Sequence, residues 1–91
     1  MAKYRKKPDT IEAVNIGQIL WDSANHWNTL PKWVIKAYDE GKLIFCPNEL
    51  RIITLEGTML GYPNDMLILG VAGEWYPCKR EIFAETYEYV G

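Results

Sequence analysis

Cys78 carries the most nucleophilic type of side chain in this sequence of 91 residues, and it stands in the segment YPCKR at residues 76–80. Neighbouring cations favour the thiolate form of a cysteine, which is the reactive one. A cysteine nucleophile also needs a general base, and nothing in the sequence places His26, the single histidine, beside Cys78. We therefore interpret Cys78 as a small packed residue at a turn and Cys46 as a core residue.

Patterns for metal binding and acid–base catalysis are weak. Two cysteines and one histidine, without a CxxC or HxxxH spacing, cannot complete a structural zinc site. Carboxylates near the expected strand ends could pair for acid–base catalysis, although such side chains are most often solvated. They are Glu12, Glu56, Asp65, Glu74 and Glu88. The glycines have neither P-loop nor dinucleotide-binding spacing. We therefore expect no enzymatic activity, no cofactor and no metal.

Aromatic and basic side chains form the strongest candidate for binding. Trp75 and Tyr76 closely precede Lys79 and Arg80, and flat rings beside cations can stack a base and hold a phosphate. A second basic cluster precedes the first expected strand. First and last strands often lie close together in small sheets, as chain termini commonly do; if they do so here, the two clusters converge on one rim, and the sequence leaves that adjacency open. The predicted site consists of Arg5, Lys6, Lys7, Trp75, Tyr76, Lys79 and Arg80.

Two ligands fit the predicted site. A small nucleotide-like anion would place its phosphate on Arg5 and Arg80 and its base on Trp75. The same residues could instead bind an acidic patch on another protein, since aromatics are also favoured at protein interfaces. The competing explanations are that all four tryptophans pack in the core and that the basic residues are simply solvated. The site is too small for long nucleic acid.

The charge of the chain is segregated along its length. Residues 1–8 carry a net +4, residues 9–73 a net −4 and residues 74–91 a net −2, which gives −2 overall. No chain-wide basic field is present to bind nucleic acid nonspecifically. No apolar run approaches the ~20 residues that span a bilayer, and the basic start lacks the apolar region of a secretory signal. With only two cysteines, we expect a cytoplasmic protein without membrane contact.

Hydrophobic periodicity and turn residues predict a single α+β domain over residues 1–91. Apolar stripes predict a helix at residues 18–28 and a second helix that starts at Pro31 and ends at Gly41. The continuously apolar segment 66–71 is typical of a central strand covered on both faces. Further extended segments are expected at residues 10–16, 42–46, 50–55, 58–62, 74–77 and 85–90, with one helical turn at 79–84. The expected fold is a small curled antiparallel or mixed sheet of about six strands packed on two helices.

The apolar faces of these elements predict the core. A core residue of the central strand, Leu67, should be among the most sensitive to truncation. The predicted core consists of Val14, Leu20, Trp33, Val34, Ala37, Ile44, Ile53, Leu67, Leu69, Val71 and Phe83.

Several segments together resemble a family of short, mostly uncharacterised proteins encoded by tailed phages and prophages. They are the opening KYRKKP followed by IEAV, the central TLEG and the closing ILGVAGEWYPCKREIFAETYE, about half of the chain. Members of the family often have Gly-Asp where this sequence has Asn64-Asp65, and Lys-Pro where it has Lys79-Arg80. The resemblance implies phage origin and a cytoplasmic role in the infected cell. It implies no activity and supplies no catalytic or binding residues.

Three functions from different classes remain open. The first is a small phage-encoded cytoplasmic binding protein that sequesters a nucleotide-like ligand or blocks a host protein, with counter-defence as one such role. The second is an assembly or structural accessory of the virion. The third is a small nucleotide-processing enzyme, which the missing catalytic clusters disfavour. We favour the binding protein. The small core, the surplus of aromatics and the strand edges also predict self-association as a homo-oligomer.

Overall fold

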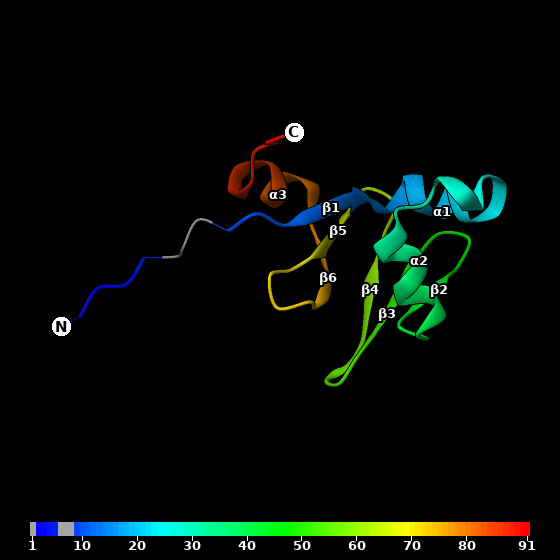
Figure 1. Ribbon diagram of the computed structural model, residues 1–91, viewed down its shortest axis with the longest axis horizontal. Helices are drawn as coiled ribbons and strands as arrows, with labels where there is room; N and C mark the ends of the chain where they lie inside the picture. The colour runs from blue at the N-terminus through cyan, green and yellow to red at the C-terminus, as the bar shows by residue number, and fades with distance from the viewer. Residues whose placement is uncertain (1, 6–8) are drawn as a thin grey trace.

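Six strands form two three-stranded antiparallel sheets in the computed structural model, which describes residues 2–5 and 9–91 (Figure 1). The first sheet has the order β1 (Glu12–Asn15), β5 (Met66–Leu69) and β6 (Trp75–Cys78), and the second has the order β2 (Leu43–Phe45), β3 (Leu50–Thr54) and β4 (Gly57–Gly61). The predicted α+β class is confirmed. The expected single sheet is instead divided in two, and every strand pair in the described residues is antiparallel.

The first helix, α1 (Ile16–Asn25), follows β1 without a break. Asn15 caps it, because its Oδ1 accepts a hydrogen bond of 2.9 Å from the backbone N–H of Gln18. The strand predicted for residues 10–16 is therefore shorter, and Gly17 lies in the first helical turn instead of separating strand from helix. The carbonyl oxygen of Pro63 would lie 2.9 Å from a Cβ at position 17, so this close approach requires glycine.

A short 3-10 helix, η1 (Trp27–Thr29), leads into α2 (Lys32–Asp39). The predicted end of α2 at Gly41 is confirmed. Gly41 has φ +75°, its N–H donates to the Tyr38 carbonyl, and the Lys42 N–H donates to the Ala37 carbonyl. These two bonds form the Schellman motif, in which a left-handed glycine satisfies the last carbonyls of a helix. The turn from α2 into β2 is thereby fixed.

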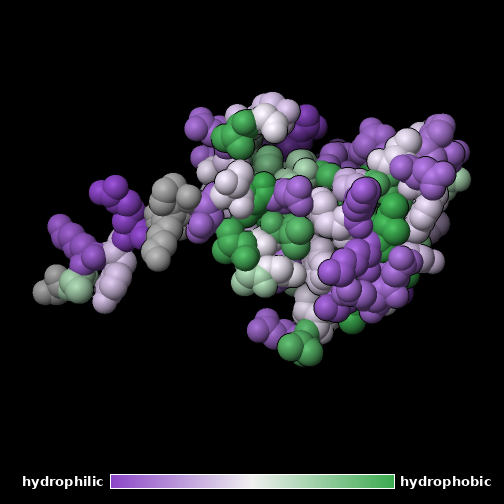
Figure 2. All heavy atoms as spheres, in the orientation of Figure 1, coloured by the Kyte–Doolittle hydropathy of each residue, from purple (hydrophilic) through white to green (hydrophobic). Residues whose placement is uncertain are grey.

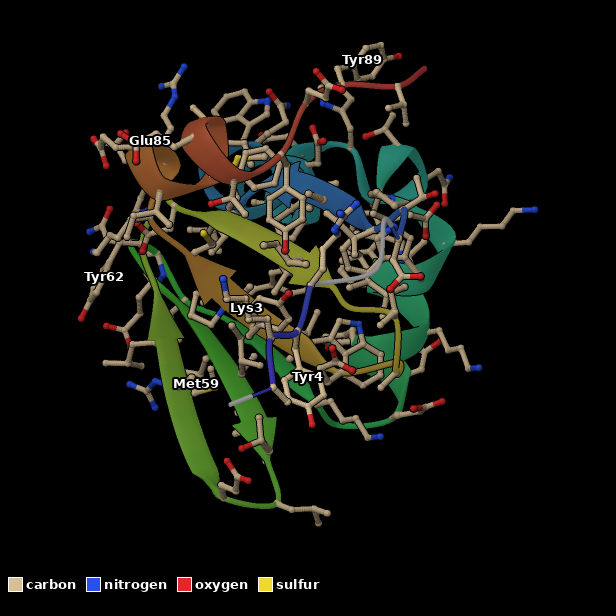
Figure 3. All side chains as sticks on the ribbon, turned by 90° about the vertical axis from the view of Figure 1, so that its left-hand side faces the viewer. Lys3, Tyr4, Met59, Tyr62, Glu85 and Tyr89 are labelled. Carbon is tan, nitrogen blue, oxygen red and sulfur yellow. The ribbon has the colours of Figure 1, made fainter. Side chains whose placement is uncertain are left out.

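The helical turn predicted at 79–84 is confirmed as part of the C-terminal helix α3 (Arg80–Thr86), whereas the final strand predicted at 85–90 is not formed. The strand prediction was wrong because residues 85 and 86 extend the helix, Tyr87 packs on Phe83, and Tyr89 is 94% exposed. The Tyr87 N–H donates to the Phe83 carbonyl and the two rings lie 5.2 Å apart, which closes the last turn of α3. In Figures 1 and 3, α3 lies on the side of the first sheet opposite to the β3–β4 hairpin.

The main core lies between the two sheets and the helices α1 and α2. It consists of Ile16, Ile19, Leu30, Val34, Ala37, Leu43, Leu50, Ile52 and Leu67. Of the predicted core, Val34, Ala37 and Leu67 are fully buried. Most of the others are half-buried, namely Val14, Leu20, Trp33, Ile53, Leu69 and Phe83.

Two predicted core residues, Ile44 and Val71, are exposed by 45% and 64%. Their prediction was wrong for different reasons. In β2, the cross-strand partner of the buried Ile52 is Leu43, which turns Ile44 to the outer face. β5 ends at Leu69, and Val71 belongs to the turn that follows.

The tryptophans do not all pack inside. Trp21 on α1 is 59% exposed, whereas Trp27 packs edge-on against the rings of Tyr38 and Phe45 at 5.0 and 5.8 Å. This aromatic cluster ties η1, α2 and β2 together. One competing explanation for the tryptophan surplus, complete burial in the core, is therefore excluded.

Candidate functional site

The register of the first sheet determines where the two predicted basic clusters lie. Glu12 and Trp75 are both partners of Leu69, so they lie at one end of the sheet. Asn15 and Cys78 are both partners of Met66, at the other end. β1 and β6 run in the same direction on either side of β5. The N-terminal arm, the segment that precedes β1, therefore joins the sheet at one end, and residues 79–80 leave it at the other. Among the residues that the structure describes, the N-terminal and C-terminal cations therefore do not converge on one rim.

The individual cations have separate surroundings. The Lys79 ammonium lies 3.6 Å from Oδ1 of the buried Asp65 and 5.7 Å from the centre of the Tyr62 ring. Arg80 is exposed at the start of α3, and Arg5 is exposed on the N-terminal arm. Lys6 and Lys7 lie outside the described residues. The structure therefore does not assemble an anion site from the described members of this set.

Trp75 and Tyr76 also face different parts of the molecule. Successive side chains of a strand point to opposite faces of the sheet. Tyr76 meets Tyr87 beyond the end of α3, and their hydrogen bond, with smaller contributions from burial and the neighbouring charges, raises the pKa of Tyr76 to about 12. Trp75 instead packs against the main core, on the side of the second sheet. Trp75 therefore faces the space between the sheets, whereas the Tyr76 ring is directed toward Tyr87.

A cleft of about 820 Å³ lies over Trp75, where three turns meet. The turns are the one between α2 and β2, the tip of the β3–β4 hairpin and the β5–β6 turn. The cleft is lined by Glu40, Gly41, Lys42, Ile53, Thr54, Leu55, Glu56, Met59, Ala72, Gly73, Glu74, Trp75 and Tyr76. In Figure 2, hydrophobic side chains gather over β5, β6 and the turn between them. A cleft of this volume is in the usual range for sites that hold small ligands or a few residues of a peptide.

The β5–β6 turn is shaped by close backbone contacts. Gly73 has φ +82°, a conformation that side chains with a Cβ rarely adopt, and the Gly70 N–H donates to the Glu74 carbonyl. A Cβ at Gly70 would overlap the Glu74 carboxylate, so the missing side chain at position 70 leaves room for that carboxylate. The Glu74 carboxylate therefore lies beside Gly70 and the Tyr76 ring, and Glu74 reaches the cleft where the β5–β6 turn ends.

One ammonium group and one indole ring dominate the floor. The Lys42 ammonium lies 5.0 Å from the centre of the Trp75 ring, and 3.6 Å from the Glu40 carboxylate. The Trp75 indole N–H is buried and has no hydrogen-bond partner among the described residues. Leaving a buried donor unpaired costs about 1–3 kcal/mol, which packing alone does not explain. The unpaired indole N–H of Trp75 therefore lowers the stability of the fold instead of adding to it.

The cleft is negatively charged, whereas the site predicted from the sequence is positively charged. Glu40, Glu56 and Glu74 border it, and Lys42 is the single cation among its lining residues. Lys42 is already engaged by Glu40. With three glutamates and one lysine, the lining residues carry a net −2, which favours a cationic group over phosphate.

Sequence patterns identified only part of this site. Trp75 and Tyr76 were predicted, and Glu56 and Glu74 were recognised as turn carboxylates that could converge with others. Glu40 and Lys42 in the turn between α2 and β2, and Met59 in β4, were missed because these segments are distant in the sequence from Trp75. The available signal was the glycine at each of the three turns, Gly41, Gly57 and Gly73, all with positive φ.

A second, shallower concavity of about 500 Å³ lies on the outer face of the second sheet. Ile44 and Leu60 are exposed there on either side of Arg51, which is their cross-strand neighbour. A bond of 2.9 Å joins Arg51 Nε to a Glu49 carboxylate oxygen, and this bond raises the pKa of Arg51. This face has no deep floor and no converging polar groups.

Other features that bear on function are few. Cys78 Sγ lies 3.5 Å from the Lys79 carbonyl oxygen, and His26 caps the end of α1. Within residues 2–5 and 9–91, three or more potential metal-ligating side chains do not come together anywhere. None of the described helices combines the length and the apolar character needed to cross a bilayer. Comparisons of the chain with protein-family models, with curated proteins and with solved structures gave no match.

Proposed function

We propose that the protein is a small phage-encoded binding protein that acts in the host cytoplasm and blocks a host protein by holding a basic segment of it. The observation that carries this proposal is the cleft over Trp75, with an apolar floor and three carboxylates at its border. The resemblance to short proteins of tailed phages supports the phage origin. Blocking a host defence protein is one role that such a module would serve.

The chemistry of the cleft selects the kind of segment. Trp75 and Met59 offer apolar surface to an aromatic or aliphatic side chain, while Glu56 and Glu74 offer acceptors to lysine or arginine. An extended segment that alternates basic and apolar residues presents one type on each side, since the side chains of a strand alternate. The cleft therefore suits a short basic–apolar peptide.

A nucleotide-like anion is the weaker alternative. Its phosphate would enter a site where the one cation, Lys42, is already paired with Glu40. The base could still stack on Trp75, but the carboxylates would oppose the charge of the ligand. The observations favour a protein partner over a small anion.

Binding of synthetic probes to the full chain tests this proposal. Isothermal titration would use an end-blocked Gly-Arg-Phe-Arg-Gly peptide, its counterpart with glutamates in place of the arginines, and ADP. We expect the basic peptide to bind with a Kd on the order of 0.1 mM, as befits a short flexible ligand. The acidic peptide and ADP should not bind measurably.

Matched charge reversals locate the site. Glu56→Lys with Glu74→Lys should weaken binding of the basic peptide about 10-fold or more, because two attractive contacts become repulsive. Glu81→Lys with Glu85→Lys, an equal charge change on the exposed α3, should leave the affinity unchanged. Equal losses in both double variants would reduce the effect to net charge, and ADP binding in place of the peptide would restore the anion alternative.

A further inference from the structure

The N-terminal arm, of which residues 2–5 are described, extends from the body of the molecule. Residues 2–5 are exposed, and the side chain of Tyr4 is 95% exposed. In Figure 1 the arm runs away from the body, and Figure 3 views the molecule from the side toward which it extends. The arm is also the basic part of the chain, since residues 1–8 carry a net +4.

We propose that the arm of one copy of this chain docks in the Trp75 cleft of a second copy. The inference rests on the proposed function, because it uses the same cleft and the same class of ligand. Charge complementarity carries it: Lys3 and Arg5 are cations on a projecting segment, and the cleft of the body is bordered by three carboxylates. The occupant is thus a basic segment that the protein itself supplies.

The alternation of basic and aromatic residues in the arm matches the cleft, which has an apolar floor and acidic residues at its border. In an extended segment, Tyr4 points to one side while Lys3 and Arg5 point to the other. Tyr4 can therefore reach the apolar floor at Trp75 and Met59 while the two cations remain at the level of the border. Docking removes a large, exposed aromatic ring from water, which favours association.

A reciprocal exchange makes the second copy the favoured occupant over the arm's own body. The described arm residues are exposed instead of being folded against the cleft of the same chain. If each copy donates an arm and receives one, the two contacts are equivalent and the assembly closes as a two-fold dimer. Two weak dockings then act together, because the second becomes intramolecular once the first has formed.

This exchange would regulate the cleft. At high protein concentration the arms occupy the clefts, and a basic segment of a partner must displace them. At low concentration the clefts are open. Partner binding and dimerisation therefore compete for the same carboxylates.

Sedimentation velocity of the full chain and of charge-reversal variants tests the exchange. We expect the unmodified chain to form a dimer at tens of micromolar. Lys3→Glu with Arg5→Glu should weaken the dimer about 10-fold or more, and so should Glu56→Lys with Glu74→Lys. Combining all four changes in one chain should restore the dimer, because arm and cleft again carry opposite charges. The control, Lys32→Glu with Lys36→Glu on the exposed face of α2, should leave dimerisation unchanged.

The outcomes separate this inference from the proposed function. A monomer at every concentration that still binds the Gly-Arg-Phe-Arg-Gly probe overturns the arm exchange and leaves the cleft as a binding site. A dimer that persists in both reversal variants also overturns it, since the interface then lies elsewhere. If the Glu56 and Glu74 reversals change the arm's NMR signals equally at all concentrations, the arm docks within its own chain and the exchange is wrong.

Discussion

The two sheets of this protein have the same number of strands and the same antiparallel pairing, but they are covered differently. In the first sheet, the adjacent residues Leu67 and Ile68 of β5 point to opposite faces and are both fully buried. In the second sheet, Ile52 is fully buried while its neighbour Arg51 is exposed. α3 lies over the far face of the first sheet, and the outer face of the second carries no covering element among the described residues.

The first sheet, covered on both faces, mainly stabilises the structure, whereas the second sheet leaves one face exposed to solvent. The doubly covered β5 anchors the first sheet, and the turn that follows it presents Glu74 and Trp75 to the cleft. The singly covered hairpin extends its tip past the core and supplies Glu56. The cleft lies where a rigid sheet and a projecting hairpin meet, which is a common place for binding sites.

The largest expected effect is the loss of either buried neighbour in β5. Leu67→Ala and Ile68→Ala should each lower the free energy of unfolding by about 2–5 kcal/mol, because each leaves a cavity on its own face. Arg51→Ala, at an alternating position of β3, should lower the free energy of unfolding far less, because its side chain is exposed. Urea unfolding monitored by circular dichroism measures all three. A cost for Ile68→Ala near that for Arg51→Ala would mean that α3 does not seal its face.

The junction between the sheets should be nearly as sensitive. A Cβ at Gly61 on β4 would overlap Cδ1 of Ile16 and lie 3.4 Å from Cβ of Pro77 on β6. Gly61→Ala should therefore cost about 1–3 kcal/mol, the usual range for overpacking. Thr58→Ala, exposed on the same strand, serves as the control for lost strand propensity. Equal melting temperatures for the two variants would show that the sheets can move apart at little cost.

The sequence predicted the elements whose signals are local. The end of α2 was predictable because a left-handed glycine follows an amphipathic helix, and the β3–β4 hairpin because Glu56-Gly57 separates two β-rich segments. The central position of β5 was predictable because a continuous apolar segment requires cover on both faces. These features depend on a few neighbouring residues only.

The missed features depend on contacts between distant segments. Consecutive apolar residues in β2 and β3 allow two registers, and only the pairing of Leu43 with Ile52 selects one. The position of the basic residues could not be predicted, because it depends on the strand order β1-β5-β6. That order is determined by the whole chain and not by local segments. The cleft was missed for the same reason, since Lys42 and Trp75 meet across the join of the two sheets.

The contact that attaches the C-terminal segment to the first sheet should give a smaller, pH-dependent effect. The hydrogen bond with Tyr87 raises the pKa of Tyr76 from 10.0 to about 12, so the folded chain holds this proton more tightly than the unfolded chain. The contribution is fully present below pH 10 and is lost as the pH rises toward 12. Tyr76→Phe should cost about 1 kcal/mol at neutral pH and should flatten the decline above pH 10.

Urea unfolding at pH 7, 10 and 11 measures how steeply the free energy of unfolding declines with pH. Tyr4→Phe on the exposed arm is the matched control, because it removes a hydroxyl that contributes nothing to folding. An equal decline in Tyr76→Phe and in the unmodified chain would show that other groups control the alkaline stability.

The smallest expected effect lies on the outer face of the second sheet. Ile44→Thr keeps a β-branched side chain at an exposed position, so the free energy of unfolding should change by no more than about 0.5 kcal/mol. Leu43→Thr, one residue earlier, buries a hydroxyl in the main core and should cost at least about 2 kcal/mol. Measuring both variants at two protein concentrations sharpens the comparison of the sheets. A large cost for Ile44→Thr that grows with protein concentration would mean that a second copy covers this face, and the two sheets would then be equally enclosed in solution.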